Sequence, residues 1–219
     1  LLTLILQKTS IERLRLSSVQ PQELTQDLLD IWENPRLCPH FHIPLQSGSP
    51  SILNKMRRRY SPDLFAAKVK EIQYRFPQSS ITTDVIVGFP GEGELEYEQT
   101  LEFCSTVDFS DMHIFPYSIR PRTSAAHLVD KVHPFEQKER MNRMLNLAIT
   151  KSNAFRNRSL GQTRPVLWET TKTKDGFFSG LTDNYLRVYT RSRRNLSSQI
   201  TLARLESFQD GTLMARPII

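Results

Sequence analysis

Residues 81–91 have the sequence Ile81-Thr-Thr-Asp-Val-Ile-Val-Gly-Phe-Pro-Gly91, a β-branched run that ends in a glycine–proline turn. The run predicts a strand over residues 81–87. Helical patterns flank it at residues 61–76 and 94–107, and residues 112–115 predict a further strand. The connections are too long for hairpins, so the alternation indicates a parallel sheet with crossover helices. The sequence therefore predicts an α/β fold.

Shorter patterns precede this region. Residues 14–19 alternate like a short strand, residues 23–32 have helical spacing, and residues 41–45 form a second short apolar run. A further helical pattern begins near Pro50. These segments extend the predicted alternation of strands and helices toward the N-terminus.

The pattern changes after Pro134. An amphipathic stretch over about residues 135–158 predicts a long helix that Gly161 ends. Short alternating runs follow, separated by turn-like clusters, and they predict a small antiparallel barrel. These runs are residues 165–169, 177–180, 185–190, 199–205 and 213–219. We therefore expect two parts, residues 1–159 and residues 160–219.

Charge is distributed unevenly between these two parts. The 219 residues carry 29 Lys and Arg against 23 Asp and Glu, a formal net charge of +6. Residues 1–150 hold 17 basic and 18 acidic side chains (17 − 18 = −1), whereas residues 151–219 hold 12 and 5 (12 − 5 = +7). A basic module after a neutral domain is typical of polyanion binding. The alternative is a solubility bias spread over the surface.

Composition excludes several classes of protein. The hydrophobic fraction of 38% supports a buried core, and no stretch of the sequence is apolar enough to span a membrane. Two cysteines, Cys38 and Cys104, exclude a disulfide framework and indicate a reducing, cytoplasmic compartment. They also cannot by themselves supply a four-cysteine metal site or ligate an iron–sulfur cluster.

Three polar or glycine-rich turns follow predicted strands, where α/β sheets collect ligands. They are residues 46–49, 88–92 and 117–120. Their small residues let a ligand approach the backbone, and their serine and glutamine side chains offer donors and acceptors. Each of them alone is also an ordinary turn.

Some charged and titratable residues have two interpretations. Arg57, Arg58 and Arg59 could hold a carboxylate or phosphate, or they could be a solvated helix end. His40 and His42 share one strand face and could ligate a metal, but no third ligand follows at a useful spacing, so we expect packing and no metal site. A hydrolase triad, a Walker loop and a dinucleotide fingerprint are all missing from the sequence. The residues alone therefore name no reaction.

Seven segments in order and in register resemble the radical S-adenosylmethionine (SAM) tRNA methylthiotransferases. They are Arg13-Leu-Arg-Leu-Ser-Ser18, Cys38-Pro-His-Phe-His-Ile-Pro-Leu-Gln-Ser-Gly-Ser49, Met56-Arg-Arg-Arg-Tyr60, Thr83-Asp-Val-Ile-Val-Gly-Phe-Pro-Gly-Glu92, His113-Ile-Phe-Pro-Tyr-Ser118, Arg122-Thr-Ser-Ala-Ala126 and Phe178-Ser-Gly-Leu-Thr-Asp-Asn-Tyr-Leu-Arg-Val188. The similarity extends from about Leu14 to the C-terminus. The residues of these motifs are most similar to those of the branch that acts on N6-threonylcarbamoyladenosine at position 37 of tRNA.

The resemblance implies the C-terminal portion of a radical SAM partial barrel with a linker helix over residues 1–159, then a TRAM domain over residues 160–219. In the family, a Cys-x3-Cys-x2-Cys triplet and three further cysteines hold [4Fe-4S] clusters. Neither set occurs in this sequence. We therefore expect a chain cut from a longer polypeptide, its N-terminal half missing, that is inactive by itself.

The resemblance also implies site residues. The residues expected to contact SAM are Gln46, Ser47, Ser49, Arg58, Asp84, Gly88, Phe89, Pro90, Tyr117 and Ser118, with the Gly88–Gly91 turn near the adenine and ribose. The residues expected to contact the anticodon loop of tRNA are Tyr185, Arg187, Tyr189, Arg191, Arg193 and Arg194, through phosphate neutralisation and base stacking. The resemblance assigns no catalytic side chain in this sequence.

The implied reaction is 2-methylthiolation of adenosine 37, which uses SAM and iron–sulfur clusters in the intact family protein. Two alternatives remain open. One is the isopentenyladenosine or the ribosomal-protein branch of the same family. The other is a cluster-free, stand-alone RNA-binding protein, which the exposed sheet edge of a cut barrel disfavours.

Overall fold

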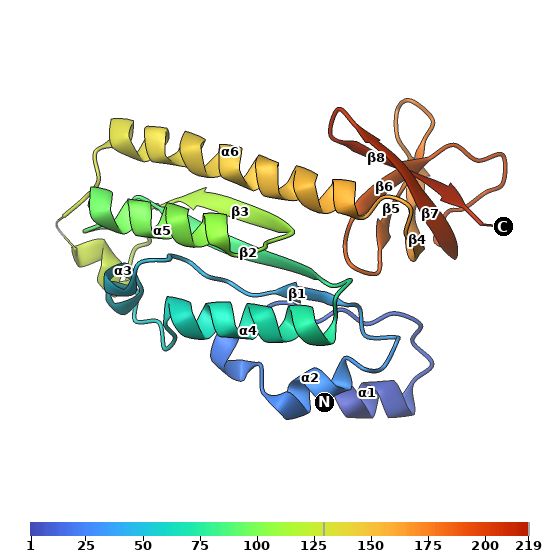
Figure 1. The fold of residues 1–219 in the computed structure, drawn as a ribbon, viewed down its shortest axis with the longest axis horizontal. Helices are drawn as coiled ribbons and strands as arrows, with labels where there is room; N and C mark the ends of the chain where they lie inside the picture. Colours follow the sequence, from blue (N-terminus) through green and yellow to red (C-terminus); the bar gives the residue numbers. More distant parts are fainter. Residues whose placement is uncertain (129, 219) are drawn as a thin grey trace.

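The computed structural model describes residues 1–128 and 130–218. A three-stranded sheet covered by helices is followed by a long helix and a closed barrel (Figure 1). The elements of the first part are α1 (Leu2–Lys8), η1 (Pro21–Glu23), α2 (Gln26–Ile31), β1 (His40–His42), α3 (Pro50–Lys55), α4 (Pro62–Arg75), β2 (Ser80–Val87), α5 (Glu94–Thr106), β3 (Asp111–Pro116), η2 (Ser124–His127) and α6 (Pro134–Arg158). The barrel consists of β4 (Thr163–Lys172), β5 (Phe178–Thr182), β6 (Arg187–Thr190), β7 (Ile200–Gln209) and β8 (Thr212–Pro217).

The sheet has the order β1-β2-β3, and all its pairs are parallel, which confirms the predicted α/β arrangement. Its longest strand, β2, alternates between two environments. Ile81, Val85 and Val87 are at most 1% exposed and pack in one core with residues of α4, α5 and α6. Thr82 and Asp84 point to the opposite side because successive side chains of a strand alternate. We call this second side the polar face of the sheet.

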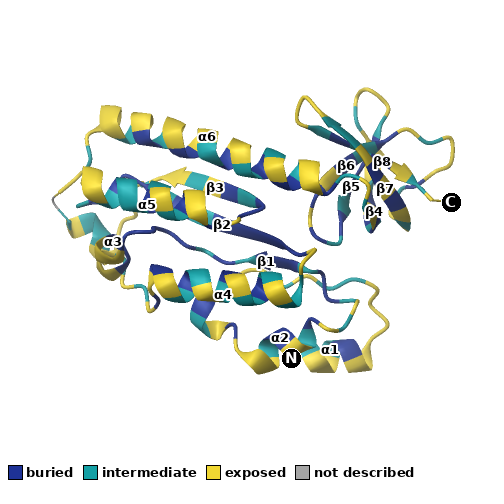
Figure 2. Cartoon of the chain, in the orientation of Figure 1, coloured by how far each residue is buried: buried dark blue, intermediate teal, exposed yellow. Residues whose placement is uncertain are grey.

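The helices begin and end where the sequence provides caps. Ser61 accepts a hydrogen bond from the Leu64 amide at the start of α4, and Pro62 occupies the first helical position. Helix α6 begins with the ring of His133 accepting from the Phe135 amide. It runs along the sheet and leads into the barrel, with its outer side exposed (Figure 2).

The predicted strand at residues 14–19 does not form. Leu14 and Ser17 make only isolated parallel bridges, to Leu37 and His42. A single bridge at each point leaves most backbone groups of this segment outside a ladder. The predicted helix at residues 23–32 is divided into η1 and α2, because Thr25 caps a new helix by accepting from the Leu28 amide.

The C-terminal residues form a closed five-stranded barrel with the order β4-β5-β6-β8-β7. Four of its pairs are antiparallel, but β6 and β8 pair in parallel, which corrects the fully antiparallel barrel expected from the sequence. Its core is separate from that of the sheet and includes Trp168, Phe178 and Val188. Among the described residues, no helix is long and apolar enough to cross a bilayer.

Candidate functional site

A cavity of about 540 Å³ lies at the carboxyl ends of β2 and β3. Its walls come from the loop after β1, the end of α3 and the segment that follows β3. In an open parallel sheet, this is the edge at which ligands bind. Six of the residues predicted to contact SAM line it: Gln46, Arg58, Asp84, Phe89, Tyr117 and Ser118.

Arg58 is one of the cations that line this cavity, together with Lys55, Arg57 and Arg120. Helix α3 ends before Arg57, which has a positive φ of 56° and turns the chain so that both arginines line the cavity. The Arg58 Nε atom is buried and has no hydrogen-bond partner among the described residues. A buried donor without a partner is costly, so this guanidinium favours an anionic ligand.

Gln46 is held at the cavity by the sheet itself. Its amide donates to the Asp84 carbonyl at 2.8 Å, and its carbonyl accepts from the Ile86 amide at 2.9 Å. Its φ of 67° is unusual for a residue with a side chain. The two backbone hydrogen bonds therefore position Gln46 beside the end of β2.

The turn after β2 is braced from below by Glu92, which is 3% exposed. Its Oε1 accepts from the Gly88 amide at 2.8 Å and from the Arg140 guanidinium of α6 at 3.3 Å. Burial raises the pKa of Glu92, an effect that the Gly88 amide and Arg140 oppose. Above this brace, Phe89 packs edge-on against Tyr117 with ring centroids 5.2 Å apart.

Four other predicted SAM contacts lie outside the cavity wall. Ser47 and Ser49 are fully buried beneath the loop, where Ser47 Oγ lies 3.0 Å from Thr100 Oγ1 and Ser49 Oγ donates to Gln99 Oε1 at 2.7 Å. Both serines tie the loop to α5. Gly88 and Pro90 belong to the turn but do not line the cavity.

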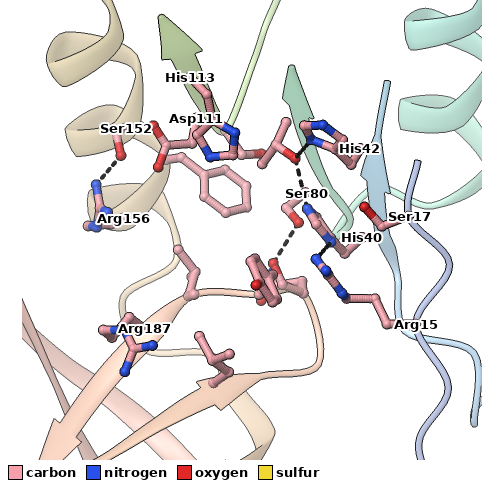
Figure 3. A pocket seen from close by; sticks show the side chains of 17 residues that line it. Arg15, Ser17, His40, His42, Ser80, Asp111, His113, Ser152, Arg156 and Arg187 are labelled. Atoms are coloured by element: carbon pink, nitrogen blue, oxygen red, sulfur yellow. Dashed lines mark hydrogen bonds between the residues drawn. The ribbon is translucent and has the colours of Figure 1, made fainter. Parts of the chain in front are cut away.

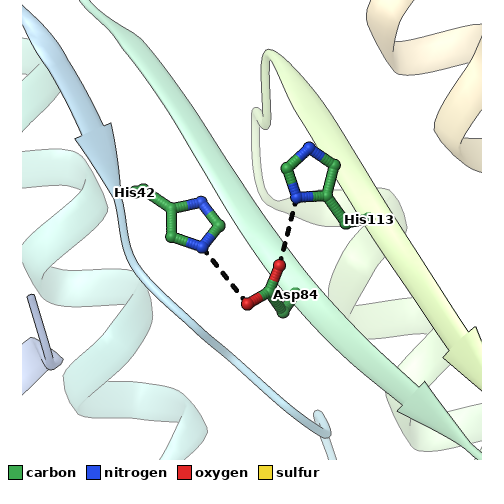
Figure 4. A group of neighbouring side chains, drawn as sticks. All are labelled: His42, Asp84 and His113. Atoms are coloured by element: carbon green, nitrogen blue, oxygen red, sulfur yellow. Dashed lines mark hydrogen bonds and ion pairs between the residues drawn. The ribbon is translucent and has the colours of Figure 1, made fainter. Parts of the chain in front are cut away.

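On the polar face of the sheet, His42, Asp84 and His113 come together from three adjacent strands (Figure 4). Asp84 Oδ2 lies 3.2 Å from His42 Nε2, and Asp84 Oδ1 lies 3.1 Å from His113 Nδ1. The spacing of residues along the sequence missed this group because its members lie in different elements. The register of β2 and β3, which pairs Asp84 directly with His113, brings these two residues together only in the folded sheet.

A second cavity of about 420 Å³ lies between the sheet and the barrel (Figure 3). At its wall His40 is 1% exposed, and burial and the charge of Arg15 lower its pKa to about 3. The ring of Tyr185 stacks on His40 with centroids 4.6 Å apart, and the Arg15 guanidinium lies 4.1 Å from the Tyr185 centroid. Tyr185, predicted to stack on RNA bases, is thus engaged with the sheet.

The other residues predicted to contact RNA lie on the barrel in different environments. Arg187 forms an ion pair with Glu169 at 2.8 Å, and Arg191 covers the ring of Phe177 at 4.5 Å. Tyr189 is half-buried on β6. Arg193 and Arg194 are exposed in the loop after β6.

The cysteines of the chain do not fit an iron–sulfur cluster. Both Cys38 and Cys104 are buried, and burial raises the pKa of Cys104 to about 12. This favours the protonated thiol, whereas iron is ligated by the thiolate. Arg13 Nε contacts the Cys38 sulfur at 3.4 Å. The two thiols are thus part of the packed structure.

Comparisons with known proteins agree with this architecture. Residues 2–104 match the family model of the radical SAM superfamily. The tRNA-2-methylthio-N(6)-dimethylallyladenosine synthase of Endomicrobium trichonymphae is 38% identical over 84% of this chain and 44% of that protein. The threonylcarbamoyladenosine tRNA methylthiotransferase of Bacillus subtilis is 31% identical over 89% of this chain and 44% of that protein. That of Thermotoga maritima is 39% identical over 80% and 40%.

The fold is also found in a solved radical SAM enzyme. Coproporphyrinogen III oxidase of Escherichia coli superposes with a TM-score of 0.55 at 12% identity, over 89% of this chain and 46% of that one. The chain spans about half the length of the relatives it matches. The matches show that the chain carries a radical SAM domain over residues 2–104 and that most of its length is similar to tRNA methylthiotransferases, at 31–39% identity to the relatives named above.

Proposed function

We propose that the chain supplies the SAM-binding and tRNA-binding parts of a tRNA methylthiotransferase. Residues 1–159 would be the C-terminal portion of the radical SAM core, and residues 160–219 a TRAM domain. The observation that carries the proposal is the convergence of six residues, which the resemblance implied from four sequence segments, on one cavity at the carboxyl edge of the sheet.

The cavity suits the parts of SAM. Arg58 would hold the methionyl carboxylate, since a planar guanidinium matches a carboxylate and its buried Nε has no other partner among the described residues. Asp84 would accept hydrogen bonds from the ribose hydroxyls, and the side-chain amide of Gln46 would donate to them. Phe89 and Tyr117 offer aromatic surface for the adenine.

Ser47 and Ser49 have an indirect role in this proposal. Because their hydroxyls are bonded to α5, they hold the loop that places Gln46, rather than the ligand. The iron–sulfur cluster of the family, which together with bound SAM supplies one-electron chemistry, would need cysteines other than Cys38 and Cys104.

The barrel would bind the anticodon region of tRNA. Residues 151–219 hold the positive charge excess, and Arg193 and Arg194 project it from an exposed loop. The proposed substrate is N6-threonylcarbamoyladenosine at position 37, on the strength of the sequence motifs. A chain that only binds RNA is the second candidate, favoured by the two cysteines that cannot hold a cluster.

SAM binding tests the first half of the proposal. The chain should bind SAM in an isothermal titration, and Arg58→Met should weaken binding at least tenfold, because a charge-assisted hydrogen bond contributes about 1.5–3 kcal/mol. Arg59→Met, an exposed neighbour, is the matched control. Equal affinity of the two variants, or no binding to the unchanged chain, would refute the proposed cofactor site and leave RNA binding as the function.

tRNA binding tests the second half. The double substitution Arg193→Gln/Arg194→Gln should weaken tRNA binding and make the slope of log K against log salt shallower by up to about 2, the number of phosphate contacts removed. The control Lys8→Gln/Lys70→Gln removes two exposed charges from the first part of the chain. Equal effects in both double variants would refute the barrel as the tRNA-binding part.

A further inference from the structure

His42, Asp84 and His113 satisfy the first requirement of a metal site, because one possible ligand atom of each lies within 4.8 Å of the others. They come from β1, β2 and β3, so three adjacent strands fix their backbones. Asp84 is the central member, with one carboxylate oxygen toward each imidazole (Figure 4). The group lies on the polar face of the sheet, away from the helix-covered core.

The surroundings orient the first of these imidazoles. His42 Nδ1 lies 2.9 Å from Thr82 Oγ1, which leaves Nε2 directed at Asp84. Thr82 is only 6% exposed and also lies 2.9 Å from His40 Nε2, so its hydroxyl is held in place. A ligating histidine characteristically bonds its second ring nitrogen to such an outer partner, which fixes the tautomer.

The donor set selects the kind of ion. Two imidazole nitrogens and one carboxylate oxygen on one side are the ligands of zinc and of non-haem ferrous iron, with the remaining coordination positions left open. The open coordination positions would face two cavities. His42 and His113 line the cavity between sheet and barrel, whereas Asp84 lines the cavity at the carboxyl edge.

We propose that His42, Asp84 and His113 bind one divalent transition-metal ion, Zn²⁺ or Fe²⁺, on the polar face of the sheet. The ion replaces the two imidazole–carboxylate hydrogen bonds and takes a nitrogen lone pair from each neutral ring. The side chain of His113 is 51% exposed, so it can make the small movement that closes the ligand set. The metal site shares Asp84 with the proposed SAM site, but it is inferred from the geometry of the three side chains and is tested without SAM.

Co²⁺ is a suitable probe, because it adopts zinc-like coordination and absorbs visible light. Titration of the tag-free chain should give a visible absorption that saturates at one ion per chain and is displaced by Zn²⁺. His113→Gln should weaken Zn²⁺ binding, measured by competition, at least tenfold. Thr82→Val, which removes the outer partner of His42 and the contact with His40 but none of the three ligands, should weaken it by about 10–100-fold.

His127→Gln is the matched control, since it removes an exposed histidine of η2 and should leave the affinity unchanged. Unchanged thermal unfolding of His113→Gln without metal would show that its loss of affinity is not a loss of fold. The proposal is overturned if no saturable visible absorption forms, if His113→Gln binds as tightly as the unchanged chain, or if a thiolate-to-cobalt band places the ion on a cysteine. Such an outcome would leave the three residues as a hydrogen-bonded group of the sheet.

Discussion

Cys104 shows how strongly its position controls a single side chain. It lies on α5 in the core of the sheet, fully buried, and burial raises the pKa of its thiol to about 12. The reactive form of a cysteine is the thiolate, so the chemistry of this residue is suppressed at neutral pH. We therefore assign Cys104 to packing.

The expected result is that Cys104 resists a thiol reagent such as iodoacetamide at pH 8 in the folded chain and reacts in denaturant. Ser105→Cys, at an exposed position on the same helix, is the control that should react readily in the folded chain. Mass spectrometry of the peptides measures both sites. Rapid modification of Cys104 in the folded chain would contradict the burial and its effect on the thiol.

At the scale of elements, the Arg140–Glu92 pair joins α6 to the turn after β2. Arg140 is 6% exposed and donates to the Glu92 carbonyl at 2.8 Å as well as to its carboxylate. The hydroxyl of Tyr97 on α5 donates to the Arg140 carbonyl at 2.9 Å. Helix α5, helix α6 and the turn after β2 are thus connected by hydrogen bonds beside the candidate SAM site.

Arg140→Met should lower the free energy of unfolding by about 3–5 kcal/mol, because it leaves a buried carboxylate without its partner. Arg143→Met should cost about 1 kcal/mol or less, since Arg143 is half-exposed in its pairs with Glu94 and Glu98. Urea denaturation measures both variants.

The cost of Arg140→Met should also shrink toward acid pH. Burial raises the pKa of Glu92, so the folded chain takes up a proton at this carboxyl more readily than the unfolded chain does. Protonation then removes the unpaired charge. A cost that stays constant or grows as the pH falls would show that the carboxylate is not the source of the loss.

At the scale of the whole molecule, polar contacts join the sheet and the barrel. Ser80 Oγ donates to the Asn184 carbonyl at 2.5 Å, and Asn184 Nδ2 donates to the Gln78 carbonyl at 3.0 Å. Arg13 donates to the carbonyls of Leu181, at 2.9 Å, and Thr182. Because the two cores are separate, these contacts and the continuous α6 couple the two parts.

The two tryptophans report on the two cores, Trp32 on that of the sheet and Trp168 on that of the barrel. In single-tryptophan variants made by replacing the other tryptophan with phenylalanine, the two thermal midpoints should coincide. Arg13→Gln/Ser80→Ala should separate them by about 2–4 °C for each kcal/mol of coupling that is lost. The control Arg193→Gln should leave the two midpoints coincident. Coincident midpoints in the double variant would show that the contacts of Arg13 and Ser80 do not couple the two parts.

Local patterns predicted most of the elements. The β-branched run at residues 81–87 became β2, the amphipathic stretch at residues 135–158 became α6, and five short runs became the five barrel strands. Strand and helix preferences act over neighbouring residues, so they are visible in the sequence. The segment at residues 14–19 failed because a strand also needs a partner that offers a continuous ladder.

The sequence by itself determined the alternation of strands and helices, the basic excess of the last third and the motifs that name the family. Only the tertiary structure decided that Ser47 and Ser49 are bonded to α5, that Tyr185 packs on His40, and that Asp84 lies between two histidines. The physical reason is distance along the chain. A hydrogen bond or ligand set between residues 29 or more positions apart depends on sheet register and domain packing, which local preferences do not contain.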